Sequence, residues 1–88
     1  MKITSIKVSS CYKKSFKKLL FRIQRKAILK IKIFKENPFD PRLKTHSLSD
    51  KNKECWAFWI DYHYRVKFIF LSNEKVLFLD IGTHEVYK

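Results

Sequence analysis

The sequence predicts an α+β domain, a two-layer sandwich of order β-α-α-β-β-β in which a helical hairpin packs on a small, mainly antiparallel sheet. Three observations support this. A β-branched segment opens the chain, a long amphipathic region without Gly or Pro follows, and three segments of alternating hydrophobicity come last. Helices followed by a strand meander are typical of two-layer α+β domains. With 88 residues, the chain has room for one domain, residues 1–88.

Residues 2–8 predict the first strand because Ile3, Ile6 and Val8 are β-branched. Ser9 and Ser10 follow, and serine is a preferred N-cap. A helix is therefore expected to begin here.

Residues 11–36 predict two helices. Apolar residues recur there at steps of three and four, and Lys and Arg fill the other positions. One helix of this length would span about 39 Å, which is long for so small a domain. We expect a break near Leu20–Arg22 and a hairpin of two helices. The recurring residues are Tyr12, Phe16, Leu19, Leu20, Ile23, Ala27, Ile31 and Phe34.

Residues 37–53 predict a loop. Pro38 pushes Asn37 out of the helical region of backbone space, and Pro41 follows soon after. A loop of 17 residues is longer than most connectors, and such loops are often functional.

The remaining segments, residues 56–62, 66–71 and 76–81, alternate in hydrophobicity as strands do. His63-Tyr64 and residues 72–74 have the length of hairpin joints. The third segment is apolar on both faces, which predicts a central strand. Its pattern places Val76, Phe78 and Asp80 on one face and Leu77, Leu79 and Ile81 on the other.

The net charge of +12 is unevenly distributed. Residues 1–53 hold 16 Lys and Arg against three Asp and Glu, whereas residues 54–88 hold four against five. Such a basic region favours a polyanionic partner: nucleic acid, an acidic protein or an anionic membrane surface. The alternative is a self-repelling soluble surface with no partner.

The sequence also limits the cellular setting. No stretch is long and apolar enough to cross a membrane, and the N-terminus lacks the apolar region of a signal peptide. Cys11 and Cys55 show no metal-ligand spacing, so reduced thiols in a cytoplasmic protein are expected.

Motifs for nucleotide cofactors and zinc are missing from the sequence. Three histidines, His46, His63 and His84, are not spaced as a ligand set, and no acidic residue or cysteine completes one. We therefore expect no metal and no cofactor.

His46 lies in the long basic loop, whose nearby cations favour its neutral form and suit it to act as a general base. An exposed histidine without a role is the alternative. The neighbouring cations, Arg42, Lys44, Lys51 and Lys53, are candidate nucleic-acid contacts.

Arg65 stands in the segment DYHYRV, beside aromatic residues that could stack on bases, and an arginine can bind phosphate through two parallel hydrogen bonds. An ion pair with Asp61 or Asp80 is the alternative. His84 and Tyr87 follow Gly82, where the last strand ends.

These positions are expected to come together in space. If the last two strands are antiparallel neighbours, Arg65 pairs near residues 80–82 and shares one end of the sheet with His84. The loop containing His46 leads into the adjacent strand, so convergence of all three side chains is plausible.

Over nearly its whole length, the chain resembles the RelE/ParE superfamily of toxins from toxin–antitoxin modules, with the RelE/YafQ-like branch nearest. The resemblance is carried by KSFKKLL, FKENPFDPRLKTHSLSD, WAFWIDYHYRVKFIF and VLFLDIGTH followed by VY. It implies the same β-α-α-β-β-β fold. It also implies a ribosome-dependent mRNA endonuclease, in which the ribose 2′-OH attacks the adjacent phosphate.

The resemblance further implies roles for individual residues. Arg65 matches the phosphate-binding arginine of the YR[VI] strand, His84 the catalytic residue after the strand-end glycine, and His46 the histidine of a K-x-H-x-L motif. Tyr87 matches a C-terminal aromatic residue that contacts the substrate, although GTHEVYK is one residue shorter than in relatives. Two alternatives stay open: a ParE-like gyrase inhibitor without nuclease chemistry, and a catalytically inactive RNA-binding member.

The resemblance also implies partners. An acidic antitoxin would wrap the toxin and cover its site, and the lysine-rich helices would dock on ribosomal RNA near the mRNA.

Overall fold

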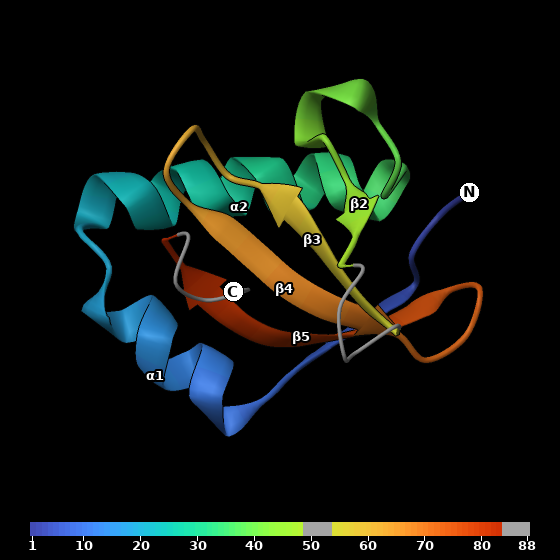
Figure 1. The fold of residues 1–88 in the computed structure, drawn as a ribbon, viewed down its shortest axis with the longest axis horizontal. Coiled ribbons are helices and arrows are strands. Elements are labelled where there is room, and N and C mark those ends of the chain that lie inside the picture. Colours follow the sequence, from blue (N-terminus) through green and yellow to red (C-terminus); the bar gives the residue numbers. More distant parts are fainter. Residues whose placement is uncertain (49–53, 84–88) are drawn as a thin grey trace.

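Two helices pack on a five-stranded open sheet in the computed structural model, which describes residues 1–48 and 54–83 (Figure 1). The sheet order is β1-β5-β4-β3-β2; β1 runs parallel to β5 and the other pairs are antiparallel. This confirms the predicted α+β class, the mainly antiparallel sheet and the interior position of the last strand. The elements are β1 (Ser5–Val8), α1 (Ser10–Lys18), α2 (Phe21–Glu36), the 3-10 helix η1 (Pro41–Leu43), β2 (His46–Ser47), β3 (Cys55–Trp59), β4 (Arg65–Phe70) and β5 (Lys75–Gly82).

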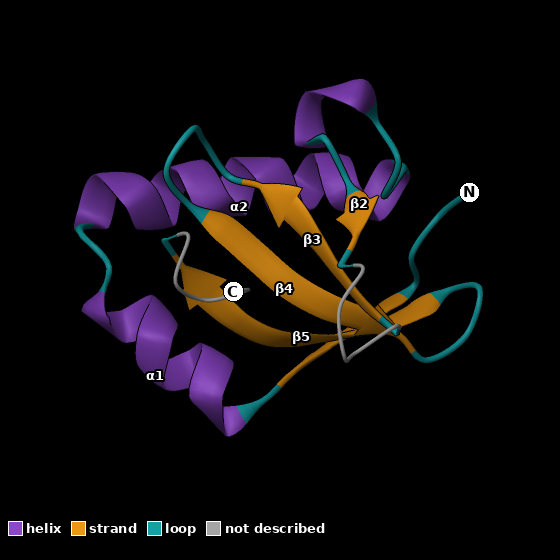
Figure 2. Ribbon diagram, in the orientation of Figure 1, coloured by secondary structure: helices purple, strands orange, loops and turns teal. Residues whose placement is uncertain are grey.

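Both helices cover the same face of the sheet, so the domain has two layers (Figure 2). Tyr12 of α1 lies 5.4 Å from Phe78 of β5, measured between ring centroids. Phe34 of α2 lies 4.7 Å from Phe58, 5.0 Å from Phe68 and 5.6 Å from Phe78. Because Phe34 is fully buried among these three strands, it is the centre of the core.

The helical region breaks at Leu19 and Leu20, next to the predicted position. Both residues have extended backbone angles, and no glycine or proline marks the turn. The side-chain amide of Gln24 donates to the carbonyl of Phe16 at 2.8 Å and ties the two helices together. The predicted cap is also present, since the Ser9 hydroxyl accepts from the backbone N–H of Tyr12 at 3.0 Å.

The prediction of one loop over residues 37–53 is wrong in part, because η1 and β2 lie within it. The Asp40 side chain caps η1, and Lys44 ends it in the left-handed region at φ 50°. The chain then pairs His46 with Ala57 and Ser47 with Trp56 at the sheet edge. A strand of two residues has no periodicity to reveal it, so β2 depends on β3 being present.

A β-bulge in β5 changes which face its last residues occupy. Lys67 pairs with Asp80 but Phe68 pairs with Phe78, so Leu79 is an extra residue. The simple alternation that grouped Asp80 with Phe78 is therefore wrong. Ile81, paired with Val66, is buried toward the helices, and Asp80 lies on the other face beside Lys67.

The face of the sheet turned away from the helices is called the second face. Side chains alternate along a strand, and paired residues share a face. Its members therefore alternate with the core residues Phe58, Val66 and Phe68. On the two central strands they are Cys55, Ala57, Trp59, Arg65, Lys67 and Ile69.

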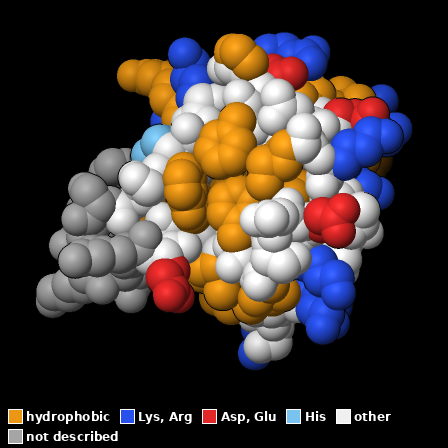
Figure 3. Space-filling view, turned by 90° about the vertical axis from the view of Figure 1, so that its right-hand side faces the viewer, with side chains coloured by type: hydrophobic (Ala, Val, Ile, Leu, Met, Phe, Trp, Pro, Cys, Tyr) orange, Lys and Arg blue, Asp and Glu red, His pale blue; other side chains and the backbone are white. Residues whose placement is uncertain are grey.

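Apolar side chains also reach the surface at one end of the sheet, where Figure 3 shows them gathered and ringed by polar and charged groups. Phe39, Trp56 and Phe70 form an aromatic cluster with ring centroids 5.5–6.0 Å apart. A pocket of about 400 Å³ lies beside Phe39 and Phe70 and is also lined by Leu71.

The two cysteines are unpaired, as predicted, with Cys11 exposed and Cys55 buried. Among the helices that the structure describes, none combines the length and the apolar character needed to cross a bilayer.

Candidate functional site

Arg65, the first residue of β4, is a charged side chain buried to 8% exposure on the second face. Its Nη1 donates to the carbonyl oxygens of Asp61 at 2.7 Å, Tyr62 at 2.8 Å and Tyr64 at 3.2 Å. All three carbonyls belong to the turn between β3 and β4, so this turn fixes the position of the guanidinium. The predicted alternative, an ion pair with the Asp61 or Asp80 carboxylate, is not among the described interactions of Arg65.

Among residues 1–48 and 54–83, the remaining nitrogens of the guanidinium have no such partners. Nε is buried without a hydrogen-bond partner among the described residues, and the hydrogen bonds of the side chain all come from Nη1. A buried donor without a partner is costly unless a ligand or water completes it. The guanidinium is thus fixed through Nη1, while Nε is left without an acceptor among the described residues.

Trp59 lies directly against this guanidinium, with Arg65 Cζ 3.8 Å from its ring centroid. Its strand pairing with Arg65 places both side chains on the second face. Lys44 Nζ also approaches the indole, at 5.2 Å from the centroid. Cations over an indole face are attracted by the ring quadrupole, so Trp59 draws two positive charges together.

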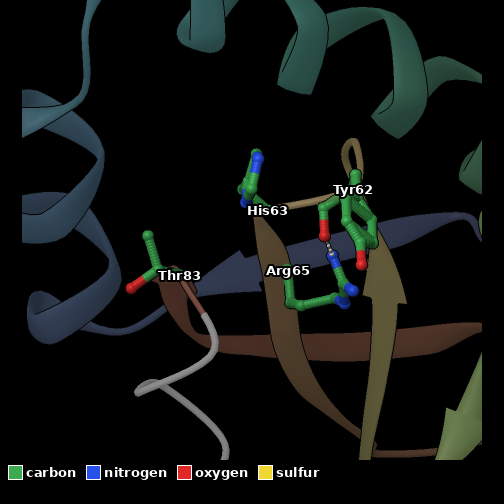
Figure 4. A pocket seen from close by; sticks show the side chains of 4 residues that line it. All are labelled: Tyr62, His63, Arg65 and Thr83. Atoms are coloured by element: carbon green, nitrogen blue, oxygen red, sulfur yellow. Dashed lines mark hydrogen bonds between the residues drawn. The ribbon is translucent and has the colours of Figure 1, made fainter.

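A pocket of about 300 Å³ opens beside Arg65 and is lined by Tyr62, His63, Arg65 and Thr83 (Figure 4). Tyr62 and His63 come from the β3–β4 turn, and Thr83 directly follows β5. Because Arg65 pairs with Gly82, the end of β5 lies next to the start of β4. The pocket therefore combines a buried cation, an imidazole and an aromatic ring that is 70% exposed, Tyr62.

Asp61 stabilises the turn that holds Arg65. Its Oδ1 accepts from the backbone N–H groups of His63 and Tyr64, both at 2.9 Å, and its Oδ2 lies 3.5 Å from Lys26 Nζ of α2. Burial alone would raise the pKa of Asp61. The two backbone hydrogen bonds and the Lys26 charge outweigh burial, so the pKa of Asp61 lies below its ordinary value.

His46 stands on β2, one strand beyond Trp59. Its Nδ1 lies 2.9 Å from the carbonyl oxygen of Lys44. A carbonyl can only accept, so Nδ1 carries a proton and the lone pair of the neutral ring is on Nε2.

Arg42 is engaged locally, because its Nε and Nη2 donate to the two oxygens of the Asp40 carboxylate at 3.0 and 2.9 Å. The side-chain hydrogen bond from Arg42 is the largest of the causes that lower the pKa of Asp40, to about 2. An arginine satisfied by its own loop is a weaker candidate for nucleic-acid binding than Lys44.

Solved toxin structures match this fold over nearly its whole length. The YafQ-containing E. coli DinJ-YafQ toxin-antitoxin complex gives a TM-score of 0.75 at 19% identity, covering 98% of this chain and 97% of that one. The YoeB/ParE toxin from Agrobacterium tumefaciens gives 0.75 at 17% identity, covering 96% and 99%. The archaeal RelE-RelB complex from Pyrococcus horikoshii gives 0.72 at 14% identity, covering 94% and 96%.

The chain has the RelE/ParE toxin fold. This confirms, at the level of the fold, the resemblance drawn from the sequence. No protein-family model matches the chain, and no curated protein matches it by sequence. The likeness is therefore one of structure at low sequence identity.

Within this RelE/ParE fold, Arg65 lies where the sequence predicted it, whereas His46 lies some distance away from it. Arg65 pairs with Gly82 as expected, and His46 shares the second face through its pairing with Ala57. Two strand spacings and two residues of offset separate the Cα atoms of His46 and Arg65 by about 12 Å. The backbone therefore does not by itself bring His46 and Arg65 together, and Trp59 lies between them. His84, Tyr87, Lys51 and Lys53 lie outside the described residues.

The candidate set drawn from the sequence omitted Tyr62, His63 and Thr83, which line the pocket with Arg65. The aromatic run in DYHYR was the available signal, but alternation assigned Tyr62 to a strand. In the structure β3 ends at Trp59, and Tyr62 belongs to the turn. Within residues 1–48 and 54–83, no three His, Cys, Asp or Glu side chains are grouped as a metal site.

Proposed function

We propose that this protein is the toxin of a type II toxin–antitoxin module and that it cleaves mRNA on the ribosome. The observation that carries the proposal is the Arg65 pocket. A buried guanidinium is held by three carbonyls, and its Nε has no partner among the residues that the structure describes. It lies beside Thr83, the residue that precedes His84 in the sequence. Structural likeness to YafQ, RelE and YoeB/ParE toxins supports the toxin assignment.

The proposed reaction is an internal phosphoryl transfer. The ribose 2′-OH attacks the adjacent phosphorus, the new O2′–P bond forms, and the bond from phosphorus to the 5′ oxygen of the next nucleotide breaks. Arg65 binds the phosphate and offsets the charge that builds up on its oxygens in the transition state. This role suits a cation that is already positioned, because its surroundings need little rearrangement during the reaction.

Two imidazoles are proposed to move the protons. Nε2 of His46 accepts the proton of the 2′-OH, and His84 protonates the leaving 5′ oxygen. Tyr87 is proposed to contact the substrate base. Since the Cα atoms of His46 and Arg65 are about 12 Å apart, the substrate must extend across Trp59 to meet both side chains.

The basic half of the chain is proposed to supply docking. Lys44, Lys51, Lys53 and Arg42 would contact ribosomal RNA or the message, a salt-dependent attraction that does not depend on sequence. An acidic antitoxin is the proposed regulatory partner, because it would neutralise the same surface in a protein of net charge +12. A cytoplasmic location follows from these partners.

Mapping the 5′ ends of cellular mRNA after induced expression tests the proposal. The wild-type chain should give codon-linked cleavage, and His84→Ala should abolish it while the circular dichroism spectrum is retained. Glu74→Gln, in the β4–β5 turn away from the pocket, is the control and should cleave normally. Intact mRNA together with stalled gyrase would overturn the proposal in favour of a ParE-like inhibitor.

A further inference from the structure

We infer that Tyr62, supported by its neighbour Trp59, forms a stacking platform for one unpaired RNA base, next to the phosphate bound by Arg65. The inference rests on the proposed function and adds a base-binding position to it. This position differs from the C-terminal Tyr87, because it is formed by the β3–β4 turn.

The exposure of Tyr62 is the first argument. Its side chain is 70% exposed, whereas the aromatic residues of β3, Trp56, Phe58 and Trp59, are buried or half-buried. An aromatic ring in this position contributes little to the core. Its exposed ring is instead available to a planar ligand, and a nucleobase is the planar group adjacent to any RNA phosphate.

Two neighbouring rings, those of Trp59 and His63, lie against Tyr62 and support it. The Tyr62 ring lies 6.1 Å from that of Trp59 and 5.1 Å from that of His63, tilted by 52° and 55°. Arg65 packs against Trp59 from the β4 side at 3.8 Å. The indole of Trp59 thus lies against both Arg65, which would bind the phosphate, and Tyr62, which would bind the base.

The backbone beneath Tyr62 is fixed, which makes stacking effective. The Tyr62 carbonyl accepts from Arg65. The Asp61 carboxylate accepts from the backbone N–H groups of His63 and Tyr64, which follow Tyr62. A ring that is already positioned loses little conformational freedom when a ligand binds. Figure 4 shows Tyr62 and Arg65 side by side at the pocket, with Thr83 across from them.

The ligand must be single-stranded. Both faces of a base inside a duplex are covered by its neighbours, so only an unpaired base can stack on Tyr62. The pocket volume of about 300 Å³ is at the lower end of the range for ligand sites and suits one nucleotide unit. Lys44, at 5.2 Å from the Trp59 ring, adds positive charge along the path of the strand.

The test is the binding of a fluorescent, single-stranded 2′-O-methyl RNA to the full chain, followed by anisotropy. The 2′-O-methyl group removes the attacking hydroxyl, so the oligonucleotide cannot be cleaved. Tyr62→Ala should weaken binding about tenfold or more, the usual effect of losing one stacked base. Tyr62→Phe should bind within about twofold of wild type, because stacking needs the ring and not the hydroxyl.

Phe21→Ala is the matched control. Phe21 is 72% exposed and has Arg25 Cζ 5.8 Å above its ring, so it repeats the pairing of an exposed aromatic with an arginine, but it lines no part of the pocket. Its removal should leave affinity unchanged. The salt dependence of binding should also be the same in Tyr62→Ala as in wild type, because stacking releases no counterions.

An abasic scan of the same oligonucleotide completes the test. One abasic position should reproduce the loss seen in Tyr62→Ala, and combining the two changes should cause no further loss. Equal affinity of Tyr62→Ala and wild type, an equal loss in Phe21→Ala, or no binding by wild type would each overturn the inference. The ribosomal cleavage assay is independent of these outcomes, so the platform can fail while the proposed function stands.

Discussion

The two faces of the sheet are stabilised in different ways. Toward the helices, Phe58, Phe68 and Phe78 surround Phe34, and burial of apolar surface needs no particular direction. On the second face, Arg65 depends on three carbonyls and one indole in specific positions. Apolar periodicity therefore identifies the helix-covered face from the sequence, whereas the second face depends on directional contacts that only the folded chain provides.

Removing the centre of the helix face should have the largest effect. Phe34→Ala should destabilise the protein by about 3–5 kcal/mol, because a fully buried ring is replaced by a cavity. Urea denaturation followed by circular dichroism measures the change. A loss below about 1 kcal/mol would show that this face collapses around the gap and is less closely packed than the ring contacts indicate.

On the second face, Arg65→Met should cost about 2–3 kcal/mol, because the carbonyls of the turn lose hydrogen bonds to a charged donor. Lys67→Met is the matched control, two residues along the same strand and on the same face. It should change the free energy of unfolding by less than about 0.5 kcal/mol. Equal losses in the two variants would mean that charge, and not the carbonyl contacts, stabilises this face.

A smaller effect is expected at Asp61, which supports the same turn. Asp61→Ala should cost about 1–2 kcal/mol and Asp61→Asn less, since an amide oxygen can still accept from the two backbone N–H groups. The pKa of Asp61 is lowered in the folded state, so its contribution is complete above the unfolded pKa of about 4 and is lost as pH falls through the lower folded value.

The stability gap between wild type and Asp61→Asn should therefore shrink on acidification. Urea titrations between about pH 6 and pH 2 measure it, because this interval covers the unfolded pKa of Asp and the range below it. A gap that stays constant would indicate that the ionised form of Asp61 has no advantage over an amide.

The smallest effect is expected for Lys44→Met, which removes a cation 5.2 Å from the Trp59 ring but keeps the aliphatic chain. The free energy of unfolding should fall by about 0.5 kcal/mol, within the range for exposed cation–π contacts. A thermal melt compared with that of Arg42→Met resolves it, because the Arg42 side chain is 66% exposed and solvent weakens its ion pair with the partly buried Asp40 carboxylate, so its loss should have a smaller effect. A larger loss of stability in Arg42→Met would mean that the Arg42–Asp40 pair in the loop stabilises the fold more than the contact of Lys44 with Trp59 does.

Much of the fold could be predicted because its signals are local. The apolar repeat from Tyr12 to Phe34 gave both helices, and alternation gave β3, β4 and β5. What could not be predicted depends on partners distant in sequence. β2 exists because β3 offers it hydrogen bonds, and the bulge at Leu79 allows both Phe78 and Ile81 to reach the core.

The candidate site divides in the same way. The pairing of Arg65 with the end of β5 followed from strand order and was expected. The partners of Arg65 were not, because backbone carbonyls are present at every residue and their directions are set by the turn. Tyr62 and His63 were visible as aromatic neighbours of Arg65, but their place on the pocket depends on where β3 ends.

The parallel pairing of β1 with β5 has a consequence for synthesis. Residues 5–8 pair with residues 75–78, and Tyr12 packs on Phe78. β1 and α1 therefore cannot pack on β5 until almost the entire chain has been translated. Contacts this distant in sequence slow folding. The protein that we propose to act on translating ribosomes can complete its own sheet only after its last strand has been made.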